Sequence, residues 1–271
     1  MGPFSGRVRA TLVVCAVAAG AGQPGAPTSV PAPDVAALKD KVARATRMLA
    51  REGIIGSSGH VSARIPGTDR VLIGPADVSR EIVTADDIVT VGIDSARIEG
   101  GRPPLETEIH TGIYRARPDV RAVVHSHPLH SVVFSITGRP ILPVSVHGAI
   151  FADGVPVFPS VGHVNTRALG DGLARTLGPH RAALLKMHGS VIVGATVEEA
   201  FVAALQLEEN AEKQLLAEAT GRVEPMTAEE AARCREQSFG PFSIAKRWQY
   251  YEEREKRERR PSNGRSRRRR G

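Results

Sequence analysis

The chain has few cysteines and few aromatic residues, and each shortage excludes a class of protein. Its 271 residues include two cysteines, Cys15 and Cys234, which lie far apart in dissimilar surroundings. Two such residues supply neither a disulfide framework nor a cysteine-based zinc site. Aromatic residues make up 4% of the chain, which argues against a surface that stacks the bases of single-stranded nucleic acid.

The chain also lacks an apolar run long enough to span a membrane. The apolar stretch at residues 10–22 follows Arg7 and Arg9 and is shorter than the roughly 20 residues that cross a bilayer as a helix. A basic start, an apolar segment and small residues are typical of a secretory signal. A disordered extension, or a start codon placed too early, explains the same residues. We therefore expect a cytoplasmic protein or, alternatively, an exported one if residues 1–22 are a signal peptide.

The net charge of +7 comes from one end of the chain. Residues 246–271 hold 12 Lys or Arg and 4 Glu, a net of +8, so the remaining residues together carry −1. The segment 252–260 is typical of a solvated helix end, and residues 265–270 of a disordered tail. We expect no specific nucleic-acid partner, with weak contact of the tail to RNA or acidic lipid as the alternative.

Helical and strand periodicities interleave from Asp34 onward, and the chain is long enough to bury one substantial core. Predicted helices lie near residues 35–49, 105–117, 128–137, 166–177, 196–219, 228–237 and 242–259, and predicted strands near residues 61–65, 71–73, 88–93, 122–125, 144, 155–158, 183–187 and 191–193. This order favours one layered α/β domain. We divide the chain into an N-terminal extension (1–33), the main domain (34–240), a C-terminal helix (241–260) and an Arg-rich tail (261–271).

Three histidines stand at the ends of predicted strands. His125 and His127 come at the end of strand 122–125, and His188 follows strand 183–187. Alternating residues of a strand point to the same face, so His125 and His127 can present two imidazoles side by side. With His188 they form a set of three nitrogen ligands that leaves one coordination position open, as in a catalytic metal site. A lone histidine near an apolar strand is more often an ordinary core or surface residue, which is our interpretation of His130, His163 and His180.

Several collinear segments between Asp34 and Gly221 resemble the class II aldolase/adducin family. They are residues 53–64, 83–89, 106–128 and 188–194. The resemblance implies a three-layer α/β/α fold in which helices cover a central mixed, largely antiparallel sheet. It also implies a homotetramer with active sites at the subunit interfaces and a small-molecule substrate.

The resemblance assigns roles to four residues. His125, His127 and His188 match the family's metal-binding histidines, and Glu106 matches its catalytic acidic residue. The implied cofactor is one divalent ion per chain, zinc first, with Mn, Fe or Co as alternatives. Such an ion stabilises the enolate that forms when a carbon–carbon bond breaks, and Glu106 can then move a proton. The alternative for Glu106 is an exposed glutamate at a helix start, where the helix dipole favours it.

The chain departs from the sugar-phosphate aldolases of this family where those enzymes hold phosphate. Pro104 and Leu105 replace a Ser-Ser pair, residues 74–77 replace a Thr-Gly or Ser-Gly turn, and His60 replaces an Asn. Two hydroxyl donors are lost and Asp77 adds negative charge, which suits a phosphate dianion poorly. We therefore predict an unphosphorylated substrate. The predicted substrate-binding turn is Ser58, Gly59 and His60.

His147 falls about where relatives place an active-site tyrosine from a neighbouring subunit, and we predict a catalytic role for it. His147 and His60 can each donate a proton or bind a carboxylate. The sequence of residues 59–62, Gly-His-Val-Ser, resembles the branch that contains dihydroxyphthalate decarboxylases, in which the metal chelates adjacent oxygens of an aromatic acid. Aldol cleavage and decarboxylation share a metal-stabilised carbanion, and the sequence does not separate them.

Three hypotheses follow. The first is a divalent-metal-dependent carbon–carbon lyase, an aldolase or decarboxylase that acts on a small hydroxy-carbonyl compound or a hydroxylated aromatic acid. The second is a non-enzymatic adducin-like interaction module, disfavoured because adducin heads lack the full histidine set found here. The third is a sugar-phosphate aldolase or epimerase, or an oxygenase, on the same scaffold. The missing serines argue against the phosphosugar enzymes.

Overall fold

The computed structural model describes Met1, Gly2 and residues 34–258. The predicted signal segment and the Arg-rich tail lie outside this part of the chain, so both remain predictions. The chain divides into two units, Met1–Ala32 and Pro33–Gly271, and the fold below belongs to the second. Among the described residues, no helix is both long enough and apolar enough to span a bilayer.

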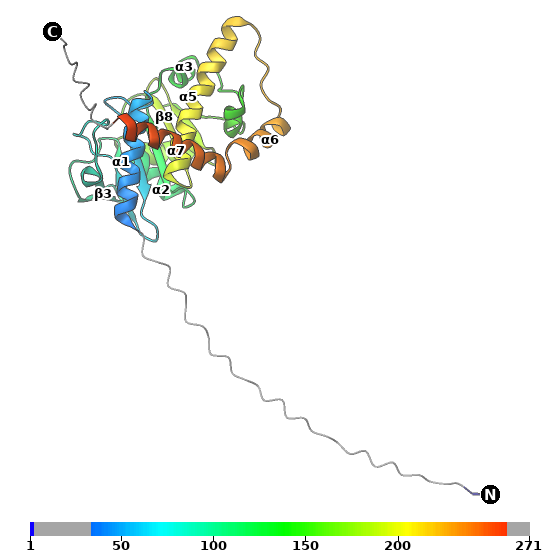
Figure 1. Cartoon of the computed structure of the whole chain (residues 1–271), viewed down its shortest axis with the longest axis horizontal. Helices are drawn as coiled ribbons and strands as arrows, with labels where there is room; N and C mark the ends of the chain where they lie inside the picture. The colour runs from blue at the N-terminus through cyan, green and yellow to red at the C-terminus, as the bar shows by residue number, and fades with distance from the viewer. Residues whose placement is uncertain (3–33, 259–271) are drawn as a thin grey trace, which may run out of the picture. The chain divides into compact units, whose positions relative to one another are not determined.

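An eight-stranded sheet forms the centre of the second unit (Figure 1). In sheet order its strands are β4 (Arg97–Glu99), β3 (Val89–Gly92), β2 (Arg70–Ile73), β1 (His60–Arg64), β5 (Ala122–Ser126), β8 (Gly189–Gly194), β7 (Ala182–Leu185) and β6 (Val157–Phe158). Neighbouring strands pair antiparallel except β6 and β7, which are parallel. The prediction of a mixed, largely antiparallel sheet is confirmed.

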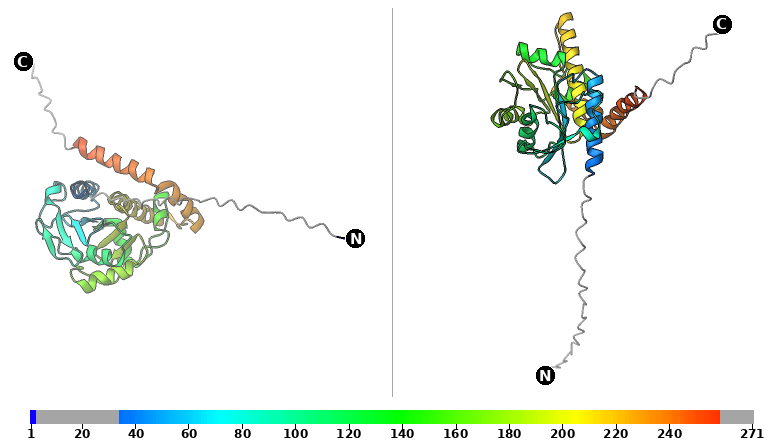
Figure 2. Two further views of the ribbon diagram at one scale, coloured as in Figure 1. Left: turned by 90° about the horizontal axis from the view of Figure 1, so that it is seen from below. Right: turned by 90° about the vertical axis from the view of Figure 1, so that its left-hand side faces the viewer.

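Helices cover both faces of the sheet and complete three layers. They are α1 (Val35–Arg51), α2 (Thr107–Ala116), α3 (Leu129–Thr137), α4 (Arg167–Leu177), α5 (Val197–Thr220), α6 (Ala228–Ser238) and α7 (Pro241–Glu258), with the 3₁₀ helices η1 (Ala85–Asp87) and η2 (Val146–Phe151). Figure 2 shows α7 lying outside the layer that α1 and α5 form. Helices α2 and α4 pack against the opposite face.

Alternation along the strands divides the hydrophobic core into two clusters. In β5, Ala122 and Val124 belong to the cluster beneath α1 and α5, whereas Val123 belongs to the cluster with Ile113 of α2 and Leu173 of α4. Successive side chains of a strand point to opposite faces. Because helices cover both faces, every residue of β5 is buried, and the end of this strand is a rigid place for polar side chains.

Most of the predicted elements are confirmed, and two places differ. Val144, predicted as a strand, forms none, because its N–H donates to the side chain of Asn210 and Ser145 then caps η2. Strand β4 is not predicted by the sequence pattern, because its three residues are all exposed. It exists as an edge strand through its pairing with β3.

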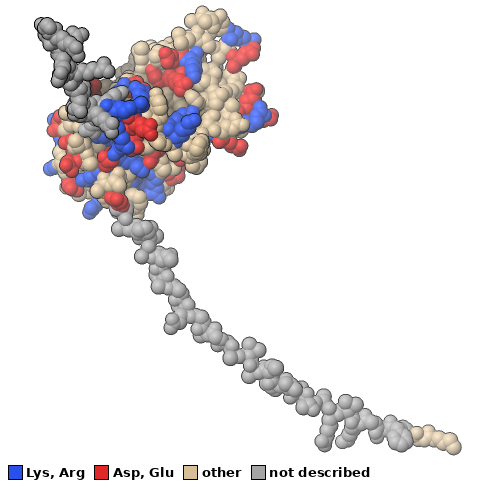
Figure 3. Space-filling view, viewed as in Figure 1, with Lys and Arg blue, Asp and Glu red and all other residues tan. Residues whose placement is uncertain are grey.

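The sequence predicts a solvated helix end at residues 252–260, and this prediction is wrong for the start of the segment. Glu252 and Glu255 instead form part of an interface with α1. Glu252 accepts a hydrogen bond from Arg44 at 2.5 Å, and Glu255, 3% exposed, pairs with Arg47. Removing one partner of a buried pair leaves an uncompensated charge, so this pair orients α7 on α1. Elsewhere on the face shown in Figure 3, acidic and basic side chains lie intermixed, as expected for a body of low net charge.

Candidate metal centre

His125, His127, His188 and Glu106 converge at one edge of the sheet. Each offers one ligand atom, and these four atoms all lie within 4.8 Å of one another. The centroid of the His125 ring is 4.7 Å from that of His127 and 5.2 Å from that of His188. The centroids of His127 and His188 are 5.0 Å apart. The structure therefore brings the four predicted residues close enough to hold one ion.

Strand pairing places the three imidazoles together. His125 is the fourth residue of β5, and His127 comes one residue after the end of this strand. His188 follows Met187, which has a positive φ of 56°, in the tight turn between β7 and β8. Ser126 pairs with Ser190 in the β5–β8 register, so the turn that carries His188 lies beside the end of β5. His127 thus reaches the cluster from just beyond the strand rather than from within it.

Gly189 leaves the space that this convergence requires. A Cβ at this position would lie 2.4 Å from the carbonyl oxygen of Ser126 and 2.9 Å from Cδ2 of His127. It would also lie 3.2 Å from Cε1 of His125. A side chain at residue 189 would therefore push apart the two backbones that carry the histidines.

The tautomer of His125 is suited to bind a cation. Its Nδ1 lies 3.0 Å from the carbonyl oxygen of Ser190, to which it donates its hydrogen. Its Nε2 then has a free lone pair, is buried, and has no hydrogen-bond partner among the described residues. An N–H donated to a backbone carbonyl is the usual support of a metal-binding histidine. The orphaned Nε2 atom therefore fits a divalent ion at this position.

Glu106 faces the same cluster with an ionised carboxylate. It is the N-cap residue of α2, yet its side chain makes no capping hydrogen bond. Its Oε1 accepts from the N–H of Val164 at 3.0 Å, and its Oε2 lies 3.4 Å from Nε2 of His125 and 3.6 Å from Nε2 of His188. Burial alone would raise the pKa of Glu106, but these neighbours lower it below the ordinary value. The side chain of Glu106 is 5% exposed and faces the histidines. The alternative interpretation, an exposed glutamate at a helix start, is therefore wrong.

The set of donors agrees with a transition metal of the zinc type. Three imidazole nitrogens and a nearby carboxylate are ligands that suit Zn²⁺ and also Fe²⁺ or Co²⁺. The distances of 3.4 and 3.6 Å between the Glu106 oxygen and the imidazole nitrogens exceed ordinary hydrogen-bond lengths. His125, His127 and His188 would hold such an ion, with Glu106 beside it.

The glycine-rich turn before β1 brings His60 to this centre. His60 pairs with His125 in the β1–β5 register, and the two ring centroids are 5.3 Å apart. Gly59 has a φ of +100°, and a Cβ there would lie 3.0 Å from the carbonyl oxygen of His125. Burial, followed by the neighbouring His125 and His110, lowers the pKa of His60 well below its ordinary value. Ser58, by contrast, is exposed.

Two histidines that the sequence pattern does not single out also contact the centre. His163 has its Nδ1 3.5 Å from Oε1 of Glu106, and its side chain is 64% exposed. His110 is fully buried and bonds to His60. The spacing of His110 could have indicated its place beside the site. Glu106, His110 and Tyr114 follow one another at four-residue steps and so share one face of α2. For His163, in the loop before α4, the sequence holds no such signal.

His147 does not join the cluster in its own chain. Its Nδ1 lies 2.9 Å from a carboxylate oxygen of Glu209, and its Nε2 accepts from Arg247 at 2.6 Å. Both ring nitrogens are therefore engaged between α5 and α7. A catalytic role of His147 at the site of a neighbouring subunit stays a prediction.

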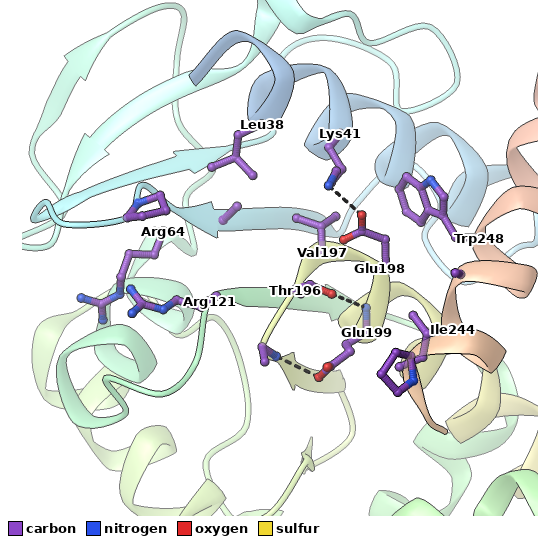
Figure 4. A pocket seen from close by; sticks show the side chains of 15 residues that line it. Leu38, Lys41, Arg64, Arg121, Thr196, Val197, Glu198, Glu199, Ile244 and Trp248 are labelled. Atoms are coloured by element: carbon purple, nitrogen blue, oxygen red, sulfur yellow. Dashed lines mark hydrogen bonds and ion pairs between the residues drawn. The ribbon is translucent and has the colours of Figure 1, made fainter. Parts of the chain in front are cut away.

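A cavity of about 700 Å³ lies at the opposite end of β5 (Figure 4). Leu38, Val197, Ile244 and Trp248 form much of its apolar wall. Lys41, one of its charged residues, forms an ion pair of 2.6 Å with Glu198. The residues that line this cavity include no histidine, so volume alone does not identify the reactive end of the sheet.

The fold and the four-residue cluster define an α/β protein with a metal-type site at the edge of its sheet. Residues 40–215 match the family model described as the class II aldolase and adducin N-terminal domain, and the chain belongs to this family.

Curated relatives include two enzymes of similar length. A 3,4-dihydroxyphthalate decarboxylase from Terrabacter sp. is 33% identical over 212 residues, which cover 73% of this chain and 88% of that protein. A 4-hydroxy-3-prenylphenylpyruvate oxygenase/4-hydroxy-3-prenylbenzoate synthase from Streptomyces roseochromogenus subsp. oscitans is 33% identical over 222 residues, or 79% of each chain. Among solved structures, the L-fuculose 1-phosphate aldolase from Glaciozyma antarctica has a TM-score of 0.72 and 25% identity over 82% of this chain and 89% of that one. Enzymes that act on aromatic acids and on sugar phosphates therefore share this scaffold.

Proposed function

We propose that the protein is a divalent-metal-dependent carbon–carbon lyase that acts on a small, unphosphorylated hydroxylated aromatic acid or hydroxy-carbonyl compound. The observation that carries the proposal is the convergence of His125, His127, His188 and Glu106 within 4.8 Å. A structural role does not explain why Nε2 of His125 is buried without a partner. An adducin-like interaction module would not require this arrangement.

The side chains around the cluster suit the chemistry of a carbanion. A divalent ion bound by the three histidines would polarise substrate oxygens and stabilise the negative charge that develops when a carbon–carbon bond breaks. Glu106 is ionised at neutral pH, so it can accept a proton from the substrate and return it to the carbon. Its backbone hydrogen bond from Val164 fixes Oε1 and leaves Oε2 directed at the reacting atoms.

The residues that surround the site favour an unphosphorylated substrate. Pro104 and Leu105 offer no side-chain hydrogen bond before Glu106, and Asp77 lines the pocket next to the glycine-rich turn. A phosphate dianion is best bound by several donors and by positive charge. Arg80 is a cation in the same pocket, but its Nε and Nη1 already donate to backbone carbonyls. Similarity to a dihydroxyphthalate decarboxylase supports an aromatic acid, and within this class we favour decarboxylation. Sugar-phosphate aldolase activity is the second candidate, supported by the similarity to fuculose phosphate aldolases.

We further propose a homotetramer whose subunits meet at the active sites. Four large apolar side chains next to site residues are more than half exposed in the single chain: Leu105 (61%), Leu129 (71%), Val161 (63%) and Met187 (53%). Each of these residues stands within two positions of His127, His163, His188 or Glu106 in the sequence, so a second chain that covers them would bury apolar surface beside the site. Light scattering of the purified protein should give four times the mass of one chain, and an active monomer would contradict shared sites.

The reaction can be tested with the metal and the base varied separately. Protein reconstituted with Zn, Mn, Fe or Co should release carbon dioxide from hydroxylated aromatic acids, whereas release of an aldehyde would favour the aldolase. Glu106→Gln should lower kcat by at least about 100-fold, because a neutral amide cannot accept the proton, while the bound metal is retained. Full activity of this variant would show that another group moves the proton. The exposed Glu236→Gln, on α6, is the matched control and should keep wild-type kcat.

A further inference from the structure

A chain of hydrogen bonds leads from the interior of the protein to the rim of the metal centre. The hydroxyl of Tyr114 lies 2.8 Å from Oγ of Ser62, and that oxygen lies 2.7 Å from Nδ1 of His110. Nε2 of His110 lies 3.1 Å from Nδ1 of His60. The first three of these side chains are at most 1% exposed, and that of His60 is 6% exposed. Three buried side chains are thus bonded in sequence to one imidazole that borders the site.

The direction of these hydrogen bonds follows from the number of hydrogens available. Ser62 is the side-chain acceptor that the structure gives to the Tyr114 hydroxyl among the described residues. If Ser62 instead donated to Tyr114, the tyrosine hydrogen would be buried without an acceptor, which is costly. Tyr114 therefore donates to Ser62, and the single hydrogen of the Ser62 hydroxyl is donated to Nδ1 of His110.

The same accounting fixes both imidazoles. An Nδ1 that accepts a hydrogen bond carries no hydrogen, so His110 must carry its hydrogen on Nε2 and donate it to Nδ1 of His60. His60, in turn, must carry its hydrogen on Nε2. This atom has no hydrogen-bond partner among the described residues and is not among the buried atoms that lack one. It is therefore open to a molecule bound at the centre.

We propose that Tyr114, Ser62 and His110 are positioning residues that hold His60 in the Nε2–H tautomer, and that His60 donates this N–H to a carboxylate oxygen of the substrate. The inference rests on the proposed function for the identity of the substrate, but the tautomer itself does not depend on it. An imidazole free to change tautomer would offer a lone pair to the same oxygen and repel it.

Arg80 supports a carboxylate as the group that His60 meets. Its side chain is 8% exposed, and its Nε donates to the carbonyl oxygen of Gly59 at 3.0 Å. Its Nη1 donates to the carbonyl oxygen of Val78 at 2.8 Å. These acceptors are neutral, and no carboxylate of the described residues lies within ion-pair distance of this guanidinium. Burial lowers the pKa of this guanidinium, and the charge of Asp77, which acts from beyond ion-pair distance, raises it by less. Buried charges usually have a close partner, which an anionic group of the substrate beside His60 would supply.

The tautomer can be measured without any turnover. Zinc-reconstituted protein labelled with ¹⁵N-histidine should show, in long-range ¹H–¹⁵N correlation spectra, that Nε2 of His60 and of His110 is protonated. The His60 signals are assigned from the loss of resonances in His60→Gln. Ser62→Ala removes the hydroxyl that donates to His110, so both tautomers of His60 should become populated. Ser62→Thr restores a hydroxyl and should restore the single tautomer. An Nδ1–H tautomer in the wild type, or an unchanged tautomer in Ser62→Ala, would overturn the proposal.

Ser131→Ala is the control for the loss of a buried serine hydroxyl. Ser131 is 0% exposed, and its Oγ has no hydrogen-bond partner among the described residues. This variant should keep the wild-type tautomer of His60. Metal content is measured in parallel. Every variant should retain the ion if the hydrogen-bonded relay of Tyr114, Ser62 and His110 acts on His60 alone.

The role of the N–H is tested by calorimetric binding of two probes, 3,4-dihydroxybenzoate and catechol, which differ by one carboxylate. Ser62→Ala should weaken binding of 3,4-dihydroxybenzoate by about tenfold, the effect of one hydrogen bond to a charged group, and leave catechol binding nearly unchanged. Equal weakening of both probes would contradict a contact with the carboxylate. Failure of the wild type to bind either probe would count against an aromatic substrate, while the spectra still decide whether the relay exists.

Discussion

The two ends of strand β5 differ in the side chains that they bring together. At its last residues, buried imidazoles meet at distances that leave Nε2 of His125 without a partner. At its first residue, the large cavity is mostly apolar, and its Lys41 is already paired with Glu198. A buried polar atom without a hydrogen-bond partner among the described residues occurs at both ends, because Nε of Arg64 beside the cavity also lacks one. What distinguishes the metal centre is that four ligand atoms lie within 4.8 Å of one another there.

The difference has a physical cause. Buried polar atoms are normally hydrogen-bonded, and an exception requires an explanation such as a ligand or an ion. The cavity lined by α1, α5 and α7 has room for a molecule, but its lining holds no histidine, and the described residues form no metal-type cluster there. The predictions below test whether changes at one end of β5 leave the other end unaffected.

The largest effect is expected from the double substitution His125→Ala with His127→Ala. It removes two of three nitrogen ligands, so metal content measured by mass spectrometry should fall from about one ion per chain to almost none. The free energy of unfolding of the metal-free protein should stay close to that of metal-free wild type, because the sheet and both core clusters remain. His130→Ala with His180→Ala, two histidines outside the cluster, should keep the ion. Metal-free wild-type protein would contradict the site itself.

An intermediate effect is expected from acid. Burial, followed by the neighbouring His125, lowers the pKa of His110 to about 3, below the 6.5 of an unfolded chain. Between these values the unfolded chain binds a proton that the folded chain does not, so stability is complete above about pH 6.5 and is lost as the pH falls toward 3. His110 should contribute up to about 1.4 kcal/mol of lost stability per pH unit within this window.

Urea unfolding of chelator-treated protein from pH 7.5 down to pH 5 measures this effect. His110→Asn should reduce the pH dependence without abolishing it, since one titrating group is gone while His60 and His127, whose pKa values are also lowered, remain. His163→Asn, at a side chain that is 64% exposed, is the comparison and should preserve the slope. Identical slopes in the wild type and in His110→Asn would show that another group is responsible for acid sensitivity.

Local patterns were sufficient for most helices and strands and for the three histidines at strand ends, whereas the largely antiparallel sheet and the role of Glu106 were predicted from the resemblance to the family. Helical spacing reported the helices well because each buries one face, and short apolar runs reported the central strands because both faces of the sheet are covered. The sequence pattern failed at Val144, where a tertiary hydrogen bond to Asn210 replaces strand pairing. The sequence pattern also failed at Glu255, where a charged side chain near the end of α7 is buried against Arg47. In both cases the partner lies more than 60 residues away, so no local pattern could indicate it.

The relay shows the same limit within the site. His60 was recognisable from its glycine-rich turn, but its tautomer depends on Ser62, His110 and Tyr114, which come from one strand and one helix that meet across the sheet. The four-residue step between His110 and Tyr114 could have indicated that they share a face of α2, although no role for His110 was predicted from it. It could not indicate that this face meets Ser62, because the register between α2 and β1 is a product of packing.

The smallest effect is expected at the opposite end of β5, from Lys41→Ala. Lys41 is 40% exposed, and its ion pair of 2.6 Å joins α1 to Glu198 in the first turn of α5. Exposed pairs contribute between about 0.2 and 1 kcal/mol, so a double-mutant cycle with Glu198→Ala should give a coupling energy in this range that decreases at high salt. Metal content and kcat should equal those of the wild type. A loss of the ion in Lys41→Ala would mean that the two ends of β5 are coupled, and that pairing at the cavity helps to set the geometry of the imidazoles.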